Sequence, residues 1–255
     1  MTFGGHLDVL RKIIVRVLII TVLFAAIIFI FKDKTFDILF APSEWDFCTY
    51  RWIENIIGIF HPEFKFEEFH VDLIATDLSS QFMTHITTSV YLGLLCASPC
   101  ILYELFKFVS PALLENEKKY SVHIVCIVYL LFIIGVMMSY FVLFPVSFRF
   151  LGTYSVADKV QSTITLDSYI STFITLTLTL GVVFQLPVIA YILGRMGLVQ
   201  SSYLIKYRPY AIIIICLIAA IITPPDIMTL ILVAVPLYFL YEISIKIIKQ
   251  IEKRH

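Results

Sequence analysis

The sequence predicts an all-α polytopic membrane protein, and three observations support this class. The mean hydropathy is +0.92, and 60% of the 255 residues are hydrophobic. Only 15% of the residues are charged, whereas soluble domains carry about 25%. The apolar runs are continuous, which excludes the alternating pattern of a transmembrane β-barrel. The net charge is zero, so the composition gives no indication of nucleic-acid binding.

Six apolar stretches are expected to cross the membrane within one domain over residues 1–255. The first four are long enough to cross a hydrocarbon core of about 30 Å. The last two are short and rise only about 18 and 22 Å. We expect them to be two short spans under a thinned bilayer, with a single re-entrant hairpin as the alternative. The six stretches are Ile13–Phe31, Phe82–Tyr103, Val122–Phe148, Tyr169–Leu193, Ala211–Ile222 and Ile227–Tyr241.

Lysine and arginine are unevenly distributed between the two sides of this arrangement. Thirteen lie on the side of the N-terminus and six lie on the other side. Because positive residues are retained in the cytoplasm, both termini are expected to be cytoplasmic. The loop 32–81 is then external, and it is acidic, with ten carboxylates against four cations. The alternation of Phe64, Lys65 and Phe66 indicates a short strand within it.

The loop 104–121 is then cytoplasmic and too short to form a domain of its own. It places Glu115 and Glu117 beside Lys118 and Lys119, at the surface of the membrane. A few charges held at a fixed depth are suited to recognising a charged peptide. The alternative is a solvated loop in which the four charges pair among themselves.

Prolines interrupt four of the expected spans. Each removes a backbone hydrogen bond and bends its helix. Together with the two short spans, they predict a curved, cup-like wall rather than a straight bundle. These residues are Pro99, Pro145, Pro187 and Pro236.

A polar stripe follows one face of the fourth span. Thr177, Gly181 and Gln185 recur at a spacing of four residues. An amide at this depth needs a hydrogen-bond partner or water. Gln185 either bonds to its own helix or to a neighbouring helix within the chain, worth about 1 kcal/mol, or faces a wetted concave surface.

Sequence motifs for catalysis are absent. The sequence has no Walker loop, no H-E-x-x-H and no G-x-S-x-G, and its five cysteines show no metal-ligand spacing. We therefore expect no enzyme, no cofactor and no metal. A small-solute transporter, which usually shows an internal repeat and a midplane ion site, is a further alternative, but neither feature is present.

A series of short motifs follows the order of the expected spans and loops, and it resembles the TatC family. The family pattern includes H-L-x-E-L-R, A-T-D, Y-F-x-x-F-P, F-E/Q-x-P, R-P-Y and T-P-P-D. Each motif alone is weak, but the ordered series is specific. The corresponding segments are 6–11, 74–77, 99–103, 108–113 with Glu117, 140–145, 184–187, 208–210 and 223–226.

This resemblance implies a signal-peptide receptor and core subunit of the twin-arginine translocase. Such a protein exports folded proteins across the bacterial plasma (inner) membrane and uses the proton-motive force. The expected partners are twin-arginine signal peptides, single-span proteins of the TatA and TatB type, and the lipid bilayer. We expect the chain to be oligomeric in the complex.

The resemblance also assigns roles to residues. Glu117 is expected to accept the arginine pair, because a carboxylate can bind a guanidinium through two parallel hydrogen bonds. The other signal-peptide residues are Asp8, Arg11, Phe108, Leu113 and Lys119. The residues expected to contact a partner helix are Tyr140, Thr177 and Gln185. The structural residues are Pro42, Pro111, Pro224, Pro225 and Asp226.

One residue departs from the family pattern. Val9 stands where the family motif has glutamate. The nearby acid is Asp8, one residue earlier, and one residue rotates a helical side chain by about 100°. The second contact to the arginine pair is therefore expected from Asp8 only if this segment adjusts.

Overall fold

The protein is described here by a computed structural model, which is dominated by helices. For residues 3–7, 108–109 and 121–123, the backbone alone is described. The described residues are 3–59, 69, 71–109, 121–154, 163–223 and 226–253.

Five stretches of helix are long and apolar enough to cross a membrane, and one further apolar helix is shorter. The predicted class of a helical polytopic membrane protein is therefore confirmed. In chain order the helices are α1 (Phe3–Ile30), α2 (Lys32–Phe40), η1 (Ala41–Ser43), α3 (Cys48–Gly58), α4 (Ser80–Val109), α5 (Ser121–Met138), η4 (Ser139–Leu143), α6 (Phe144–Thr153), α7 (Leu166–Val183), α8 (Leu186–Arg195), α9 (Ser201–Lys206), α10 (Arg208–Ile222) and α11 (Ile227–Glu252).

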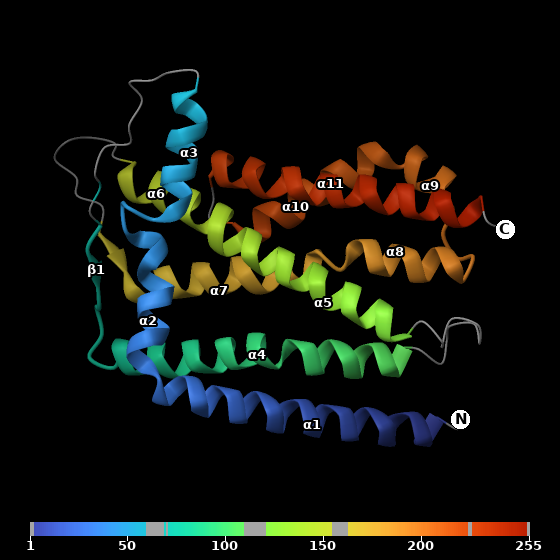
Figure 1. Cartoon of the computed structure of the whole chain (residues 1–255), viewed down its shortest axis with the longest axis horizontal. Helices are drawn as coiled ribbons and strands as arrows, with labels where there is room; N and C mark the ends of the chain where they lie inside the picture. The colour runs from blue at the N-terminus through green and yellow to red at the C-terminus, as the bar shows by residue number, and fades with distance from the viewer. Residues whose placement is uncertain are drawn as a thin grey trace.

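The long helices lie beside one another in a broad layer (Figure 1). At one edge α1 packs along α4. In the middle α5 packs against α7, and α8 continues α7 and packs against α11, which also contacts α10. Both ends of the chain lie at the same end of the layer, where α4 ends and α5 begins (Figure 1). We call this the terminal end, and the opposite end, where α2, α3 and α6 gather, the loop end.

The last two membrane helices differ from the prediction in one respect. α10 has 15 residues and is short, as expected. α11 has 26 residues, rather than the 15 expected for Ile227–Tyr241, so the prediction of a short last span is wrong. The predicted span ended at Tyr241, whereas the helix continues through Glu242, which is paired with Arg208 of α10 at 2.8 Å. At about 39 Å, α11 can cross a membrane by itself, which favours two spans over a hairpin.

Two of the four span prolines interrupt a helix, and two do not. Pro145 stands in the first turn of α6 and Pro187 in the first turn of α8. Pro99 lies inside α4, and Pro236 lies inside α11. The expected bends therefore fall on the third and fourth spans.

The break before Pro145 is compensated by another helix. Pro145 has no N–H to donate to the carbonyl four residues earlier, that of Phe141. The hydroxyl of Thr49, on α3, donates to this carbonyl instead. The preceding segment η4 is a π-helix, which also alters the spacing of the backbone hydrogen bonds at this point. A residue of the loop thus satisfies a polar group that proline leaves open.

Aromatic side chains form the core of the loop end. The ring of Phe144 meets those of Tyr169 and Phe173 edge-on, with ring centroids 5.0 Å apart in both pairs. Such edge-to-face pairs add about 0.5–1.5 kcal/mol beyond burial. The hydroxyl of Tyr169 donates to the carbonyl of Leu39, at 2.7 Å. This contact ties α2 to α7.

Tyr50 ties α3 into the same core. Its hydroxyl lies 2.9 Å from the carbonyl of Pro145 and 3.1 Å from that of Pro42. The guanidinium of Arg149 lies 5.2 Å from the centroid of the Tyr50 ring. Burial raises the pKa of the Tyr50 hydroxyl, which Arg149 offsets in part. The hydroxyl therefore remains a neutral donor.

A two-stranded sheet, which the sequence did not predict, lies at the loop end. β1 (Leu73–Ile74) pairs in parallel with β2 (Ile164–Thr165), and Leu73 stands opposite Ile164. The strand expected at Phe64–Phe66 lies outside the described residues. The described part of the loop 32–81 is mostly helical, in α2, η1 and α3.

We predict that Thr49→Val lowers the free energy of unfolding by about 1–2 kcal/mol. The substitution preserves shape, but it leaves the carbonyl of Phe141 without the donor that replaces the N–H missing at Pro145. Urea unfolding of the purified protein in detergent measures this change.

The control for that experiment is Thr153→Val. The hydroxyl of Thr153 is exposed and donates to the carbonyl of Arg149 within its own helix, at 2.7 Å. Its loss should cost no more than about 0.5 kcal/mol. Equal effects of the two substitutions would contradict a special role for Thr49.

Candidate functional site

Four of the residues expected in the signal-peptide site or its loop lie outside the described residues. These are Pro111, Leu113, Glu117 and Lys119, and the structural prolines Pro224 and Pro225 also lie outside. Phe108 belongs to the last turn of α4, which continues to Val109. Residues 104–109 are thus helix rather than loop.

The N-terminal motif lies at the terminal end. Asp8 and Arg11 are exposed on α1, and their spacing of three residues puts them on one helical face. Val9 is 37% exposed. It shares a face with Arg16, seven residues further on, whereas Asp8 is rotated from that face by about 100°. The start of α1 lies at the same end as the last turn of α4 (Figure 1).

An ion pair joins α1 to α4 below this end. A guanidinium nitrogen of Arg16 contacts a carboxylate oxygen of Glu104. The Glu104 side chain is only 7% exposed, and that of Arg16 is 55% exposed. Burying a carboxylate without a cation is costly, so Arg16 compensates a charge that the apolar helix could not otherwise hold. The pair fixes the N-terminal helix relative to the helix that leads into the charged loop.

Sequence reasoning missed Glu104. It lies within a long apolar stretch, Ser80–Lys107. An acid inside such a stretch needs a partner, and that requirement was the available signal. The sequence could not identify Arg16 as the partner of Glu104, because the two residues are 88 positions apart along the chain.

A second polar region lies where α7 gives way to α8. The side-chain amide of Gln185 donates to the carbonyl of Val128 on α5, at 3.2 Å, and approaches the carbonyl of Gly181, at 3.4 Å. Its carbonyl oxygen is buried and has no hydrogen-bond partner among the described residues. Gln185 therefore binds across two helices and retains one unused acceptor.

Glycines let α5 and α7 come close enough for this contact. A Cβ at Gly181 would lie 2.6 Å from the ring of Phe132 on α5. A Cβ at Gly135 on α5 would lie 2.7 Å from the carbonyl oxygen of Leu180 on α7. Both distances are below those that real Cβ atoms show, so neither position accepts a larger residue without movement. Small residues at interfaces are the usual device for close helix packing in membranes.

The other two residues expected at a partner contact lie elsewhere. Thr177 is 1% exposed, and its hydroxyl lies 3.1 Å from that of Ser139 in η4. The hydroxyl of Tyr140 donates to the carbonyl of Ile38, at 2.7 Å, at the loop end. The structure thus does not gather Gln185, Thr177 and Tyr140 on one surface.

The polar residues around α10 and α11 close the far edge of the layer. Asp226 caps α11 by accepting from the N–H of Thr229, at 2.7 Å, a typical N-cap arrangement. Glu242 accepts from Arg208 at 2.8 Å and from Tyr238 at 3.0 Å. The pair of Arg208 with Glu242 joins the short α10 to the long α11.

No three histidine, cysteine, aspartate or glutamate side chains come together as a metal site within the part of the chain that the structure describes. The polar groups of the two regions are hydrogen-bonding and charge-pairing groups. Groups of this kind form hydrogen bonds and ion pairs with charged or amide-bearing side chains.

Comparisons with known proteins agree on one family. The model of the family described as "Sec-independent protein translocase protein (TatC)" matches residues 5–236. The Sec-independent protein translocase protein TatC of Blattabacterium sp. subsp. Periplaneta americana is 34% identical over 258 residues, spanning 100% of this chain and 97% of that relative. The TatC protein of Carboxydothermus hydrogenoformans is 31% identical over 255 residues, spanning 100% of this chain and 95% of its own.

A solved structure gives the same result. The chain is similar to the crystal structure of the twin-arginine translocase receptor TatC, with a TM-score of 0.76 and 31% sequence identity. The match covers 97% of this chain and 99% of that one. The likeness thus extends over the whole arrangement of helices.

We predict that Arg16→Ala lowers the free energy of unfolding by about 1–3 kcal/mol, because it leaves the buried Glu104 carboxylate without its cation. Adding Glu104→Gln should recover part of this loss, since the neutral amide is less costly to bury. A double-mutant cycle, measured by urea unfolding in detergent, gives the coupling energy.

The control for that cycle is Arg51→Ala. Arg51 contacts Asp46 at 2.7 Å, but the two side chains are 65% and 46% exposed. An exposed pair contributes at most about 1 kcal/mol. A coupling at Arg16 no larger than that at Arg51 would show that burial of Glu104 does not matter.

Proposed function

The chain belongs to the TatC family of Sec-independent protein translocases, and we propose from this membership how its two polar regions serve transport. It is a core subunit of the twin-arginine translocase and not an enzyme. We propose that the terminal end receives the twin-arginine signal peptide. The second region, around Gln185, contacts the single-span TatA- or TatB-type partners.

One observation carries the first proposal. The N-terminal motif on α1 and the helix that leads into the charged loop lie together at the terminal end (Figure 1), and Arg16 pairs with Glu104 between them. Two segments far apart in the sequence are thereby held at one place. A peptide that contacts both can be recognised by acids from each.

Glu117 is the proposed arginine acceptor in the loop. A carboxylate can accept two parallel hydrogen bonds from the planar guanidinium, whereas a lysine ammonium offers a single point charge. A site built on such pairing discriminates arginine pairs from lysine pairs. Phe108 and Leu113 shape the loop in this proposal, and Arg11 and Lys119 border it.

Asp8 is the proposed second acceptor. It is exposed on α1, next to Val9, which occupies the position of the family glutamate. Its direction differs from that of Val9 by about 100°. In this proposal the peptide approaches α1 from a side rotated by about 100° from that of the family motif, with Arg11 on the same face as Asp8.

The region around Gln185 supports the partner proposal. Its amide already joins α7–α8 to α5 through Val128, and its carbonyl oxygen keeps an unused acceptor within the described residues. A polar group on a partner span can use this acceptor after a small rotation of the side chain. Because glutamine does not ionise, the contact is a neutral hydrogen bond. In this arrangement Thr177 contacts Ser139 inside the protein, and Tyr140 binds the carbonyl of Ile38 at the loop end.

The chain is a multi-pass membrane protein. We propose that both termini face the cytoplasm of a bacterial cell, because the excess of lysine and arginine lies on that side. The protein then binds the signal peptide in the cytoplasm, where the cargo protein is synthesised. We propose from the family membership that the proton-motive force supplies the energy.

We predict that Glu117→Ala abolishes the preference for a twin-arginine peptide over its lysine twin. Binding to the purified protein is measured by fluorescence anisotropy with labelled synthetic peptides. The unchanged protein should prefer the arginine peptide by about 10- to 100-fold, as expected for a charged hydrogen-bonded pair. In the variant the two affinities should agree within about twofold.

The matched control is Glu115→Ala, which removes an acid two residues away in the same loop. It should keep the preference for arginine. Discrimination that survives Glu117→Ala and disappears in Glu115→Ala would move the arginine acceptor to Glu115.

We predict that Gln185→Leu reduces co-purification of a TatB-type partner at least about fivefold, the effect of losing one hydrogen bond of about 1 kcal/mol. Peptide binding should remain unchanged, because the terminal end is not touched. Gln185→Glu should retain the partner, since glutamate keeps an acceptor.

Ser139→Ala controls for damage to the interface between α5 and α7. It removes the hydroxyl pair with Thr177 and leaves Gln185 intact. Partner retention should be normal in this variant. If Ser139→Ala and Gln185→Leu lose the partner equally, the effect reflects helix packing and not a contact with Gln185.

A further inference from the structure

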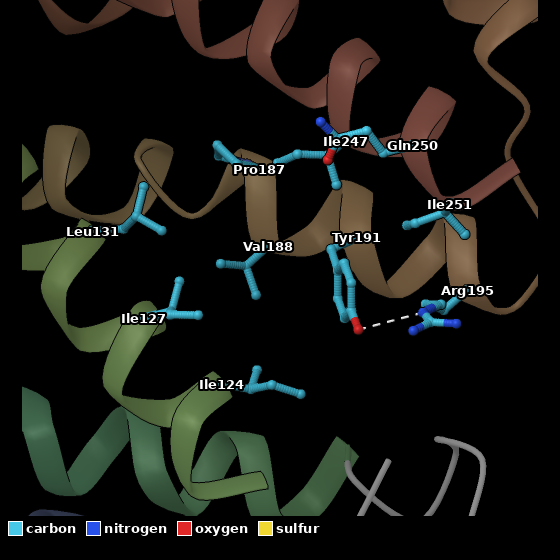
Figure 2. Close-up of a pocket in the computed structure, with 10 residues that line it drawn as sticks. All are labelled: Ile124, Ile127, Leu131, Pro187, Val188, Tyr191, Arg195, Ile247, Gln250 and Ile251. Atoms are coloured by element: carbon cyan, nitrogen blue, oxygen red, sulfur yellow. Dashed lines mark hydrogen bonds between the residues drawn. The ribbon is translucent and has the colours of Figure 1, made fainter. Parts of the chain in front are cut away.

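A groove with a volume of about 430 Å³ runs between α5, α8 and α11 (Figure 2). Its apolar wall, which includes Ile124, Ile127 and Leu131 of α5, belongs to helices that can cross a membrane. Contact with lipid tails accounts for such a wall. The exposed apolar side chains of α3 need another explanation, because α3 has 11 residues and rises only about 17 Å, which is too short to cross.

These side chains form a stripe along α3. Trp52, Ile56 and Ile59 are 71%, 60% and 77% exposed. Their spacing of four and then three residues places them on one side of a helix, and Ile59, which follows the last residue of α3, keeps helical backbone angles. Large apolar side chains gathered on a surface indicate contact with another apolar medium.

The orientation of α3 differs from that of the spans. It runs across the long helices rather than along them (Figure 1). Because the long helices are those that can cross a membrane, α3 is directed parallel to the plane of the membrane. A short amphipathic helix in this orientation can lie at the boundary between lipid head groups and acyl chains.

A contact with a span places α3 near the depth of this boundary. The hydroxyl of Thr49, in the first turn of α3, donates to the carbonyl of Phe141 in η4. Phe141 lies well inside the candidate span Ile124–Thr153. The next residue, Val142, is an exposed apolar residue, so lipid can reach η4 beside the point where α3 is attached.

A second contact shows which side of α3 faces the interior of the membrane. The hydroxyl of Tyr50 donates to the carbonyl of Pro145, at 2.9 Å. Pro145 lies four residues beyond Phe141, closer to the end of the span at Thr153. The side of α3 that carries Thr49 is therefore turned toward the membrane interior, relative to the side that carries Tyr50.

The apolar stripe lies on the side of Thr49. At about 100° per residue, Ile56 lies about 20° from Thr49 around the helix, Trp52 about 60° and Ile59 about 80°. Each of the three lies at least about 120° from Tyr50. The exposed apolar side chains thus point toward the lipid and away from the outer side of the loop end.

We propose that α3 is an interfacial helix that inserts Trp52, Ile56 and Ile59 into the lipid leaflet at the loop end. Tryptophan is enriched at this depth of membranes, because its ring is apolar and its N–H is polar. The insertion fixes the depth of α3 and, through Thr49 and Tyr50, supports the span at the break before Pro145. This role is independent of peptide and partner binding.

Apolar burial drives the insertion, and attraction to anionic head groups does not. The loop 32–81 has ten carboxylates against four cations. On α3 itself, Arg51 is paired with Asp46 at 2.7 Å, and it lies about 160° around the helix from Thr49. The inserted side is therefore uncharged, and the arginine lies on the opposite side.

Tryptophan fluorescence tests the proposal directly, because Trp45 and Trp52 are the two tryptophans of the chain. Trp45→Phe leaves Trp52 as the single reporter. The protein is placed in nanodiscs that hold one chain each. Phosphatidylcholine brominated near the head-group end of its acyl chains should quench Trp52 by at least about half, as expected for a ring about 5–10 Å below the surface. Iodide in the water should have little effect.

The matched control is a tryptophan on the opposite side of α3. Arg51→Trp is made in a chain that also carries Trp45→Phe and Trp52→Phe. Since a helix with its side chains is about 10–12 Å across, this reporter should respond to iodide at least about threefold more strongly than Trp52, and brominated lipid should quench it less. Equal responses of the two reporters to iodide would overturn the proposal.

Lipid charge separates the two driving forces. Replacing half of the phosphatidylcholine by phosphatidylglycerol should leave the quenching of Trp52 unchanged. Deeper insertion in the anionic bilayer would show that charge drives the contact, and the apolar mechanism would be wrong.

Ile56→Asp adds a charge to the stripe. It should make Trp52 accessible to iodide, while circular dichroism shows that the helices remain. Binding of the twin-arginine peptide and of a TatB-type partner should not change, so this variant separates the insertion of α3 from the Glu117 and Gln185 proposals. A Trp52 that stays inserted beside Asp at position 56 would contradict the assignment of the stripe.

The rival occupant of the stripe is a second copy of this chain. In that case Trp52 would be open to iodide in nanodiscs with one chain, and it would be protected from both iodide and brominated lipid in nanodiscs with two. This result would replace the lipid by a protein contact and overturn the proposal. Quenching by brominated lipid that is equal in the two preparations supports it.

Discussion

A polar group between membrane helices must find its partner inside the protein, because lipid offers none. This constraint explains several of the long-range polar contacts in the structure. Thr49 donates to the carbonyl that Pro145 leaves open, Arg16 compensates the buried Glu104, and Gln185 binds a carbonyl on α5. Each contact joins segments distant in the sequence, so satisfying polar groups also fixes the arrangement of the helices.

The same constraint separates the two ends of the molecule. At the loop end, aromatic rings and tyrosine hydroxyls hold α2, α3, α6 and α7 in a dense core. Toward the terminal end, the ion pair of Arg16 with Glu104 joins α1 to α4. The peptide site that we propose lies at this end, apart from the aromatic core.

Much of the fold could be predicted from the sequence because hydrophobicity and length act locally. The helical class and the short α10 follow from them directly. The prediction failed at α11, which continues past Tyr241 through Glu242, whose carboxylate is paired with Arg208 of α10. The pairing of β1 with β2 was also missed, because two-residue strands carry almost no pattern. For the proposed site, the motifs pointed to the N-terminal segment and Gln185, whereas no role was assigned to Glu104 from the sequence.

The sequence by itself determined that this is a multi-span helical membrane protein with the ordered motifs of one family, because composition and short motifs are properties of the chain. The tertiary structure alone decided which polar residues meet. It placed Arg16 on Glu104, buried Thr177 against Ser139, and joined Thr49 of α3 to the carbonyl of Phe141. These outcomes depend on how separate helices pack, and side-chain pairing across 30 or more residues leaves no local signal in the sequence.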